Sequence, residues 1–270
     1  MAQVLGQSGR YVSEEARKQS DLITQQFFIT IGILGVIEGL VVSSILPIGR
    51  LPALVRMLFG IAALGAMVIL VKRSTAKLSQ LSKYRDALRR GADGELQVGR
   101  IVSNLPDEFC VVNDLTTPFG NLDHVVVGPT GIFVLDAKNW RGVVSADGKG
   151  ELLLNGKATD KPVVRPFVSR MMGIRDKVRT LSPGPDPYYK ALLVFTAARV
   201  DANWGSTGKV HCVRDDQLHD YIVGESGTHL SPDEVERVAQ AFLGLAHMDR
   251  GFTRPRPNGL VVSDLAESPL

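Results

Sequence analysis

The chain has 270 residues, a formal net charge of +3 at pH 7 and 44% hydrophobic residues. Its two cysteines are too few for a disulfide scaffold and are consistent with a reducing compartment, while the five scattered histidines show no zinc-binding spacing. The sequence has no phosphate-cradling loop and no dinucleotide-binding glycine motif, so it does not suggest a bound nucleotide. The mild positive charge permits nucleic-acid binding without requiring it.

Two apolar segments, residues 27–48 and 51–71, follow a polar lead. Each is long enough to span a bilayer core, which needs about 20 apolar residues per helix. The connector between them is very short and contains Pro47 and Pro52, which break helices. These segments predict a tight transmembrane hairpin. They do not resemble a signal peptide, because a long polar stretch precedes the first run and no small-residue cleavage site follows it.

Basic residues predict the orientation of this hairpin. The connector offers only Arg50 and, at the edge of the second span, Arg56. Seven basic residues follow the second span: Lys72, Arg73, Lys77, Lys83, Arg85, Arg89 and Arg90. The positive-inside rule therefore places the long C-terminal region, and with it the N-terminus, in the cytoplasm, with the hairpin in a plasma membrane or bacterial-type inner membrane.

Polar and small residues within the first span raise the question of helix packing. Glu38 lies in mid-span, where it marks a helix–helix contact or an oligomer interface, or is a protonated, tolerated acid. Gly32, Gly35 and Gly39 lie at helical spacing and predict close packing of the two spans.

A β-hairpin is the most informative feature of the second half. The runs Val125–Val127 and Ile132–Leu135 flank a Gly/Pro turn at Gly128–Gly131, and their continuous apolar character predicts strands buried on both faces. Antiparallel pairing about this turn brings Asp123 and Asp136 close together at one end.

Lys138 lies two residues beyond Asp136 and therefore on the same side of its strand. Carboxylates are preferred ligands of Mg²⁺, and a nearby lysine can orient a water molecule and stabilise phosphate charge. The group predicts a site for Mg²⁺ or Mn²⁺. Alternatively, Asp123 caps the hairpin and the Asp136–Lys138 pair is an exposed strand-end pair of little energetic value.

Neighbouring motifs complete a resemblance to a known family. A Gly91–Glu95 segment opens a helical pattern, a strand is expected at Phe109–Val112, and Asn139–Gly142 closes the Asp-x-Lys strand. From about residue 90 to 195 the chain resembles the NERD (nuclease-related domain) family of PD-(D/E)xK, restriction-endonuclease-like phosphodiesterases. The resemblance implies an α/β fold with an αβββαβ core. It also implies an active site in which Glu95, Asp123 and Asp136 bind the metal and Lys138 is catalytic.

The segment after these strands departs from the family pattern and carries further candidates. Where the family usually has Asn-Pro and then Gln, this chain has Arg165 and Ser169. The helix expected at Pro166–Leu181 also carries Arg175 and Arg179, one turn apart. With Arg165, these are candidate contacts to a phosphate backbone, although such a charge run is commonly a solvated face.

The sequence predicts six regions: a polar cytoplasmic lead (1–26), a transmembrane hairpin (27–71), a basic helical connector (72–90), a nuclease-related domain (91–222), a C-terminal helix (223–249) and a disordered tail (250–270). The main hypothesis is a membrane-anchored, cytoplasm-facing, metal-dependent nuclease in DNA processing or nucleic-acid defence. Two alternatives stay open: a non-catalytic tethered module that binds nucleic acid or protein, favoured by the altered Arg165–Ser169 segment, and an oligomeric assembly or signalling subunit.

Overall fold

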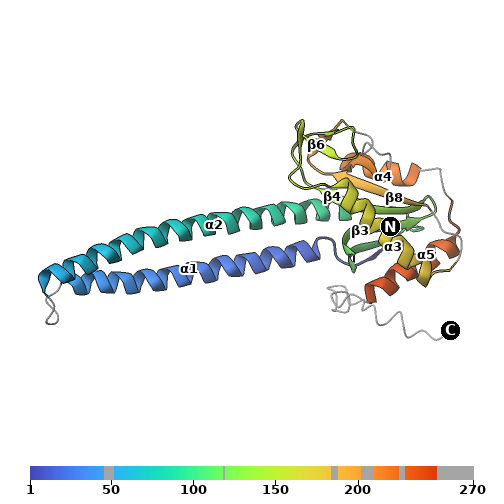
Figure 1. Cartoon of the computed structure of the whole chain (residues 1–270). Helices are drawn as coiled ribbons and strands as arrows, with labels where there is room; N and C mark the ends of the chain where they lie inside the picture. The colour runs from blue at the N-terminus through green and yellow to red at the C-terminus, as the bar shows by residue number, and fades with distance from the viewer. Residues whose placement is uncertain (46–51, 118, 184–187, 202–209, 225–228, 248–270) are drawn as a thin grey trace. The chain divides into compact units, whose positions relative to one another are not determined.

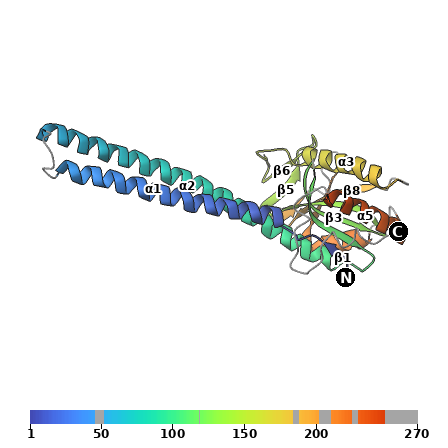
Figure 2. The same ribbon diagram turned by 90° about the horizontal axis from the view of Figure 1, so that it is seen from below.

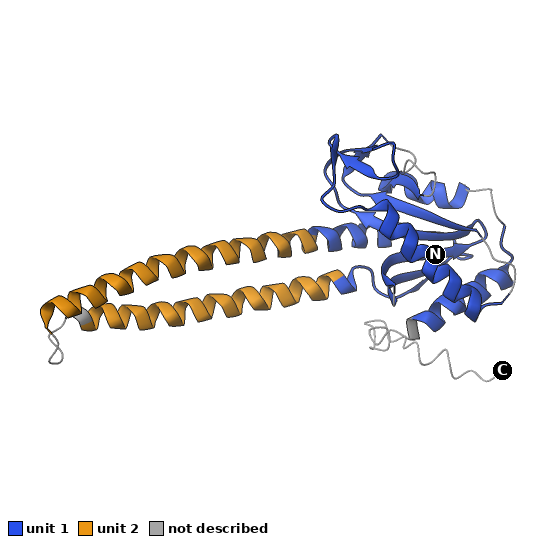
Figure 3. Cartoon of the chain, in the orientation of Figure 1, with its two compact units in different colours: residues 1–11, 90–270 blue, residues 12–89 orange. Residues whose placement is uncertain are grey.

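The computed structural model describes residues 1–45, 52–117, 119–183, 188–201, 210–224 and 229–247. Contacts divide the chain into two compact units (Figure 3). Residues 12–89 form what we call the helical unit, and residues 1–11 together with 90–270 form the α/β unit. The predicted mixed α/β class is confirmed by the strands and helices of the second unit.

The helical unit consists of parts of two long helices, α1 (Arg10–Ile45) and α2 (Ala53–Ser103) (Figures 1 and 2). By length and composition alone, both could cross a membrane, with mean hydropathies of 1.9 and 2.4 over their most apolar windows. Only 6% of each window is buried, so large apolar side chains such as Phe28 (67% exposed) and Leu54 (71% exposed) point outward. The predicted connector around Pro47 falls in residues 46–51, outside the described residues.

Helix α2 is longer than any predicted element. Because no proline interrupts residues 53–103, the second apolar span, the basic connector and the helix that carries Glu95 form one continuous α-helix of 51 residues. Only its last part, from residue 90, belongs to the α/β unit.

The glycines of α1 do not pack the two helices together, so that prediction is wrong. Apart from the helix's own neighbouring backbone, a Cβ atom placed on Gly32, Gly35 or Gly39 would meet no described atom within 4 Å. The two helices are instead joined by a buried hydrogen bond of 3.0 Å between Thr30 Oγ1 and Ser74 Oγ. These hydroxyls supply a polar contact between the two helices.

The α/β unit is built on a six-stranded sheet in the order β1-β2-β3-β4-β8-β10. The central strands β2, β3 and β4 are antiparallel, and the remaining neighbours pair in parallel. The strands are β1 (Gln3–Leu5), β2 (Cys110–Thr117), β3 (Gly120–Gly128), β4 (Gly131–Lys138), β8 (Tyr189–Phe195) and β10 (Val210–Arg214). A smaller sheet, in the order β7-β6-β5-β9, comprises β5 (Gly142–Ala146), β6 (Leu152–Leu154), β7 (Lys157–Ala158) and β9 (Ala198–Val200).

Helices cover both faces of the large sheet. Helices α3 (Val164–Leu181) and α5 (Pro232–His247) pack on one face, and the end of α2 with α4 (Asp215–Gly224) packs on the other (Figures 1 and 2). Alternate residues of each strand therefore enter different cores: Val125 lies under α3 and α5, and Val126 lies under α2. Two buried faces explain the continuous apolar runs in the sequence.

The predicted β-hairpin is present as β3 and β4, which pair in antiparallel register and close at Gly128 and Gly131. The chain then follows the order α2, β2, β3, β4, α3, β8, with β5, β6 and β7 inserted between β4 and α3. Helix α5 begins with a capping box, in which Ser231 and Glu234 bond reciprocally to each other's backbone N–H.

The N-terminus differs from the expected polar lead. Strand β1 pairs in parallel with β2, and residues 1–11 belong to the α/β unit. The reason is the open edge of β2, which pairs with a short extended segment. Gln3 N–H also bonds to the carbonyl of Phe109, the residue before β2, at 3.0 Å. Helix α5 also packs within this unit rather than apart from it. The predicted tail, residues 250–270, lies outside the described residues.

Candidate active site

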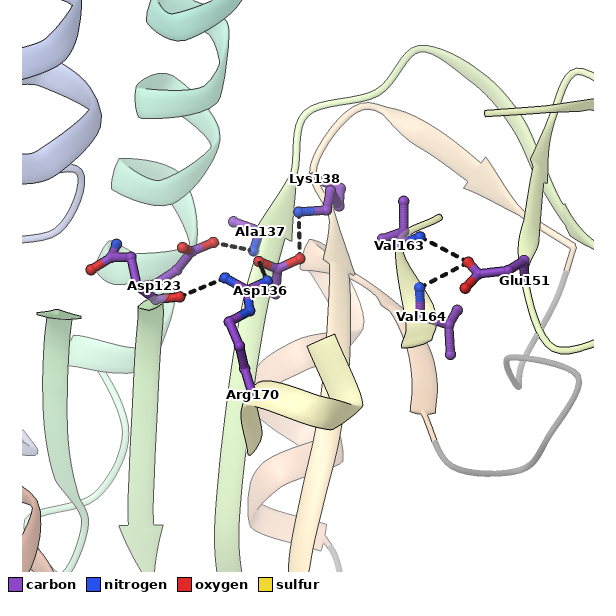
Figure 4. A network of polar contacts seen from close by, with 9 residues as sticks. Asp123, Asp136, Ala137, Lys138, Glu151, Val163, Val164 and Arg170 are labelled. Atoms are coloured by element: carbon purple, nitrogen blue, oxygen red, sulfur yellow. Dashed lines mark hydrogen bonds and ion pairs between the residues drawn. The ribbon is translucent and has the colours of Figure 1, made fainter. Parts of the chain in front are cut away.

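Strands β3 and β4 separate where their two aspartates meet. The ladder ends at the pair His124 and Leu135, and the same register places Asp123 opposite Asp136 as the next pair. The Asp123 carboxylate accepts a hydrogen bond of 2.8 Å from the backbone N–H of Ala137 (Figure 4). The Asp123 side chain thus accepts a hydrogen bond from a backbone N–H group that lies beyond the paired residues of β3 and β4.

Asp136 lies between two cationic side chains (Figure 4). Lys138, two residues along β4 on the same face, forms an ion pair with Asp136 Oδ2. Arg170 of α3 places its Nη2 atom 3.8 Å from Asp136 Oδ1. The carboxylate is only 8% exposed, so solvent screens these charges less than at an open surface.

Glu95 reaches the same region from α2. The preceding residue, Gly94, lets the helix come close to the end of β4, since an added Cβ would lie 3.0 Å from Asn139 Cβ. Asn139 fixes this contact by donating a hydrogen bond of 2.9 Å to the carbonyl of Arg90. Glu95 is buried, and its Oε2 atom has no hydrogen-bond partner among the described residues.

The buried acids repel one another. Burial, followed by the charges of Asp123, Asp114 and Asp136, raises the pKa of Glu95 to about 9. Burial and then Asp136 raise the pKa of Asp123 to about 7, although Lys138 opposes this shift. Burial lowers the pKa of Lys138, but the charges of Asp136 and Asp123 outweigh it and leave that pKa raised. Such a cluster favours an additional positive charge near Glu95 and Asp123.

Asp114 is a fourth acid that the sequence reasoning missed. In the β2–β3 register it lies opposite Asp123, between the pairs Asn113–His124 and Leu115–Leu122. It is buried and adopts a left-handed backbone conformation with φ of 53°. The sequence did contain a signal for this residue, because an aspartate within the largely apolar run Cys110–Leu115 is unusual.

Arg170 was also missed as a site residue. The buried stripe of α3 consists of Val164, Phe167, Met171, Ile174 and Val178. Arg170 follows Phe167 by three residues and so lies beside this stripe, directed toward the sheet. That helical spacing was a signal in the sequence. The α3 arginines predicted to bind nucleic acid occupy other positions on the helix.

Those three arginines are arranged as follows. Arg165 is exposed at the start of α3 and lines a cavity of about 380 Å³ together with Lys149 and Ser169. Arg179 is exposed and Arg175 is half-buried, one turn apart. Their charges therefore lie along the helix that also brings Arg170 to Asp136.

His124 is structural, as the alternation along β3 predicts. It lies on the opposite face from Asp123 and is fully buried beneath α2. Its Nδ1 atom lies 2.7 Å from Asn113 Oδ1, and burial lowers its pKa to about 4.

The side chains of the site are of the kind that binds a divalent cation, but they are not already arranged as a metal-binding cage. Among the residues that the structure describes, no three His, Cys, Asp or Glu side chains are grouped closely enough to hold a metal ion. The unpartnered oxygen of Glu95 and the mutual repulsion of the carboxylates are nevertheless what a bound cation would relieve. Asp136 would have to turn from Lys138 to take part.

The end of α2, the strands that follow it and the acid cluster lie within one stretch of the chain. Residues 90–196 match the family model of the nuclease-related domain. The resemblance that the motifs indicated is thereby confirmed. No curated protein and no solved structure matches the chain. The nuclease-related domain match includes Glu95, Asp123, Asp136, Lys138 and Arg170, whereas β1 and α5 lie outside it.

Proposed function

We propose that this protein is a membrane-anchored, cytoplasm-facing, metal-dependent nuclease with a restriction-endonuclease-like core. The observation that carries the proposal is the separation of β3 and β4 at Asp123 and Asp136, with Lys138 and Glu95 beside them, inside a nuclease-related domain. An acid pair and a lysine at the open end of two buried strands suit phosphodiester hydrolysis.

Each residue has a defined role in this proposal. Glu95, Asp123 and Asp136 would hold one Mg²⁺ or Mn²⁺, which when bound polarises the scissile phosphate. Lys138 positions the attacking water by hydrogen bonding and stabilises the negative charge that develops on the phosphate oxygens. Burial of the acids strengthens these interactions, because water is largely excluded from them.

Nucleic acid, in our proposal DNA, would approach along α3. Arg165, Arg175 and Arg179 supply positive charge on this helix, and Lys149 adds a second cation beside Arg165 at the cavity. Contacts of this kind neutralise phosphates without reading sequence, so binding would weaken as salt rises. They support binding to nucleic acid, which a role in DNA processing or nucleic-acid defence requires.

The helical unit supports the membrane anchor. Its exposed apolar side chains form rows that water would solvate poorly. Residues 11 and 90, which flank this unit, both belong to the α/β unit, so a chain that crosses a membrane here must return to the same side. The basic residues after the second span then favour the cytoplasmic side.

Cleavage of labelled DNA and RNA, single- and double-stranded, tests the enzyme. The full chain in detergent should be used, because residues 1–11 belong to the α/β unit. We expect cutting with Mg²⁺ or Mn²⁺, none with EDTA, and loss in Lys138→Ala, Asp123→Ala and Asp136→Ala. Lys157→Ala, on exposed β7, is the matched control. Undiminished cutting by the Asp123 and Asp136 variants would contradict the proposal.

A second candidate is a non-catalytic tethered module that binds nucleic acid or protein. It is favoured by the ion pair between Asp136 and Lys138, which occupies one predicted metal ligand. Isothermal calorimetry with Mg²⁺ separates the two functions. Heat that disappears in Glu95→Gln supports the nuclease, whereas a folded protein with neither heat nor cleavage supports the binding module.

Membrane association and assembly have their own tests. Resistance of the full chain to alkaline carbonate extraction would support the anchor, and protection of the α/β unit from protease outside intact cells would support the cytoplasmic orientation. Homo-oligomers predict a detergent-corrected mass above that of one chain, and a plain monomer contradicts them.

A further inference from the structure

A continuous series of polar contacts connects the start of α1 with Asp136. Arg10 Nε lies 3.5 Å from Asp114 Oδ2, and Asn121 Nδ2 donates to Asp114 Oδ1 at 2.9 Å. Arg170 Nη1 then donates to the carbonyl of Asn121 at 2.7 Å. Its other terminal nitrogen faces Asp136 Oδ1 at 3.8 Å. Figure 4 shows the part of this series around Arg170.

The Arg170 side chain is held in place by the backbone of β3. The carbonyl that it binds belongs to Asn121. Because Asn121 pairs with Thr116 of β2, this carbonyl is held within the sheet. Gly120 leaves space for the Arg170 side chain, since an added Cβ there would lie 2.9 Å from Arg170 Cδ. The guanidinium stays charged at any relevant pH and has a planar set of donors, so it can hold a carboxylate in one orientation.

Asp136 is thereby constrained from both sides. Arg170 faces Oδ1, and Lys138 pairs with Oδ2. If Lys138 turns to a water molecule or phosphate, Arg170 still lies beside Oδ1 of the carboxylate. A side chain that fixes the orientation of a ligating carboxylate affects metal affinity as well as activity, by about 10–100-fold in known sites.

Asn121 extends this constraint to the N-terminal segment. Its side-chain amide binds Asp114 and accepts a hydrogen bond from Thr116. Asp114 is buried and accepts a hydrogen bond of 2.6 Å from the backbone N–H of Tyr11. The first turn of α1 is therefore tied to the strand that carries Asp123.

We propose that Arg170 is a positioning residue for Asp136, and that Asn121 and Asp114 connect it to the N-terminal segment at Arg10. This inference rests on the proposed metal-dependent nuclease. It gives the segment before the apolar hairpin a direct part in shaping the site.

The test measures Mg²⁺ affinity by calorimetry and cleavage kinetics on the full chain. For Arg170→Ala we expect the Kd for Mg²⁺ to rise about 10–100-fold and kcat to fall, with the KM for DNA nearly unchanged. Arg170→Lys should recover part of the Mg²⁺ affinity, because its ammonium group can still act as a donor to the Asp136 carboxylate. Lys177→Ala, exposed on the same helix, is the matched control and should behave as wild type.

The connection to the N-terminal segment is tested by a double-mutant cycle. Asn121→Ala should weaken Mg²⁺ binding less than Arg170→Ala, since it keeps the carbonyl that Arg170 binds. The two changes should be non-additive if they act through one series of contacts. Additive effects would overturn the connection.

Other outcomes overturn the positioning role. A raised KM for DNA with unchanged Mg²⁺ affinity would make Arg170 a substrate contact. Reduced thermal stability with unchanged affinity in the folded protein would make it purely structural. If wild type neither binds Mg²⁺ nor cleaves, the proposed function itself fails, and the inference fails with it.

Discussion

Asp123 lies directly opposite Asp136 across β3 and β4, one residue beyond the last paired residues, His124 and Leu135. The two strands are thus hydrogen-bonded up to the acids and open at them. Buried carboxylates at such an opening are held by the sheet on one side and can meet a ligand on the other. This relationship, more than any single residue, supports the proposed binding of a cation and a phosphate.

The buried acids should make stability depend on pH. A free glutamate has a pKa near 4.5, and Glu95 in the fold has a pKa of about 9. The native state therefore binds the extra proton between these values, so unfolding free energy falls as pH rises through this window. Without metal, we expect the melting temperature of the α/β unit to be higher at pH 5.5 than at pH 8.5.

Glu95→Gln is the control for this dependence. It removes the titrating group while keeping the shape, so the melting temperature should vary less between the two pH values. At pH 8.5, Mg²⁺ should raise the melting temperature of wild type more than that of the variant, because it stabilises the ionised carboxylates. An identical pH profile in both proteins would argue against a strongly raised pKa of Glu95.

Removing residues 1–11 should destabilise the α/β unit. Leu5 packs in the core at 6% exposed, and Asp114 would lose its contacts to Arg10 and the Tyr11 backbone. Breaking one side of a buried charge pair costs about 3–5 kcal/mol. Thermal unfolding followed by circular dichroism should therefore show a large drop in melting temperature.

A fusion checks this interpretation. Joining residues 1–11 to residue 90 through a flexible Gly/Ser linker replaces the whole helical unit and should give a folded protein that needs no detergent. A fragment that begins at residue 90 should fold poorly. Equal stability of the fragment and the fusion would mean that β1 and Arg10 contribute little.

The sequence predicted those parts of the fold that depend on local pattern. The Gly128–Gly131 turn and its flanking apolar runs determined the β3–β4 pairing, and that pairing brought Asp123 and Asp136 together. Lys138 followed from the period of two along a strand. Strand β1 could not be predicted, because three residues carry little pattern and their pairing with β2 depends on a distant, unoccupied strand edge.

The supporting residues of the site were harder to predict for the same reason. Asp114 and Arg170 act through partners that are distant in sequence, at separations of 103 residues to Tyr11 and 49 to Asn121. No motif spacing connects them. The prediction for the glycines of α1 was wrong for a different reason. Their helical spacing does not determine which face of the helix meets the partner helix.

Gly94→Ala should disturb Glu95 through backbone displacement. The added Cβ would lie 3.0 Å from Asn139 Cβ and 3.4 Å from Thr196 Oγ1, so Asn139 or helix α2 must give way by a few tenths of an ångström. Such overpacking costs about 1–3 kcal/mol. We expect a lower melting temperature and reduced cleavage. Gly65→Ala on the same helix is the control, because its Cβ would meet nothing within 4 Å.

Glu151 caps helix α3 from the inserted strands, and its removal should loosen the helix that carries Arg170. Its carboxylate accepts hydrogen bonds from the backbone N–H groups of Val163 at 2.8 Å and Val164 at 2.9 Å (Figure 4). It also accepts one from the backbone N–H of Arg165 at 3.0 Å. These donors have no partner within the helix, and a carboxylate there also interacts favourably with the helix dipole.

Loss of such a cap costs about 0.5–2 kcal/mol. Thermal unfolding of Glu151→Ala should show this loss, with Glu151→Gln intermediate because it keeps one acceptor oxygen. Asp160→Ala, an exposed acid nearby, serves as the control and should unfold like wild type. Cleavage by Glu151→Ala should fall moderately, since α3 holds Arg170 against Asp136. Wild-type stability in Glu151→Ala would show that water replaces the carboxylate at no cost.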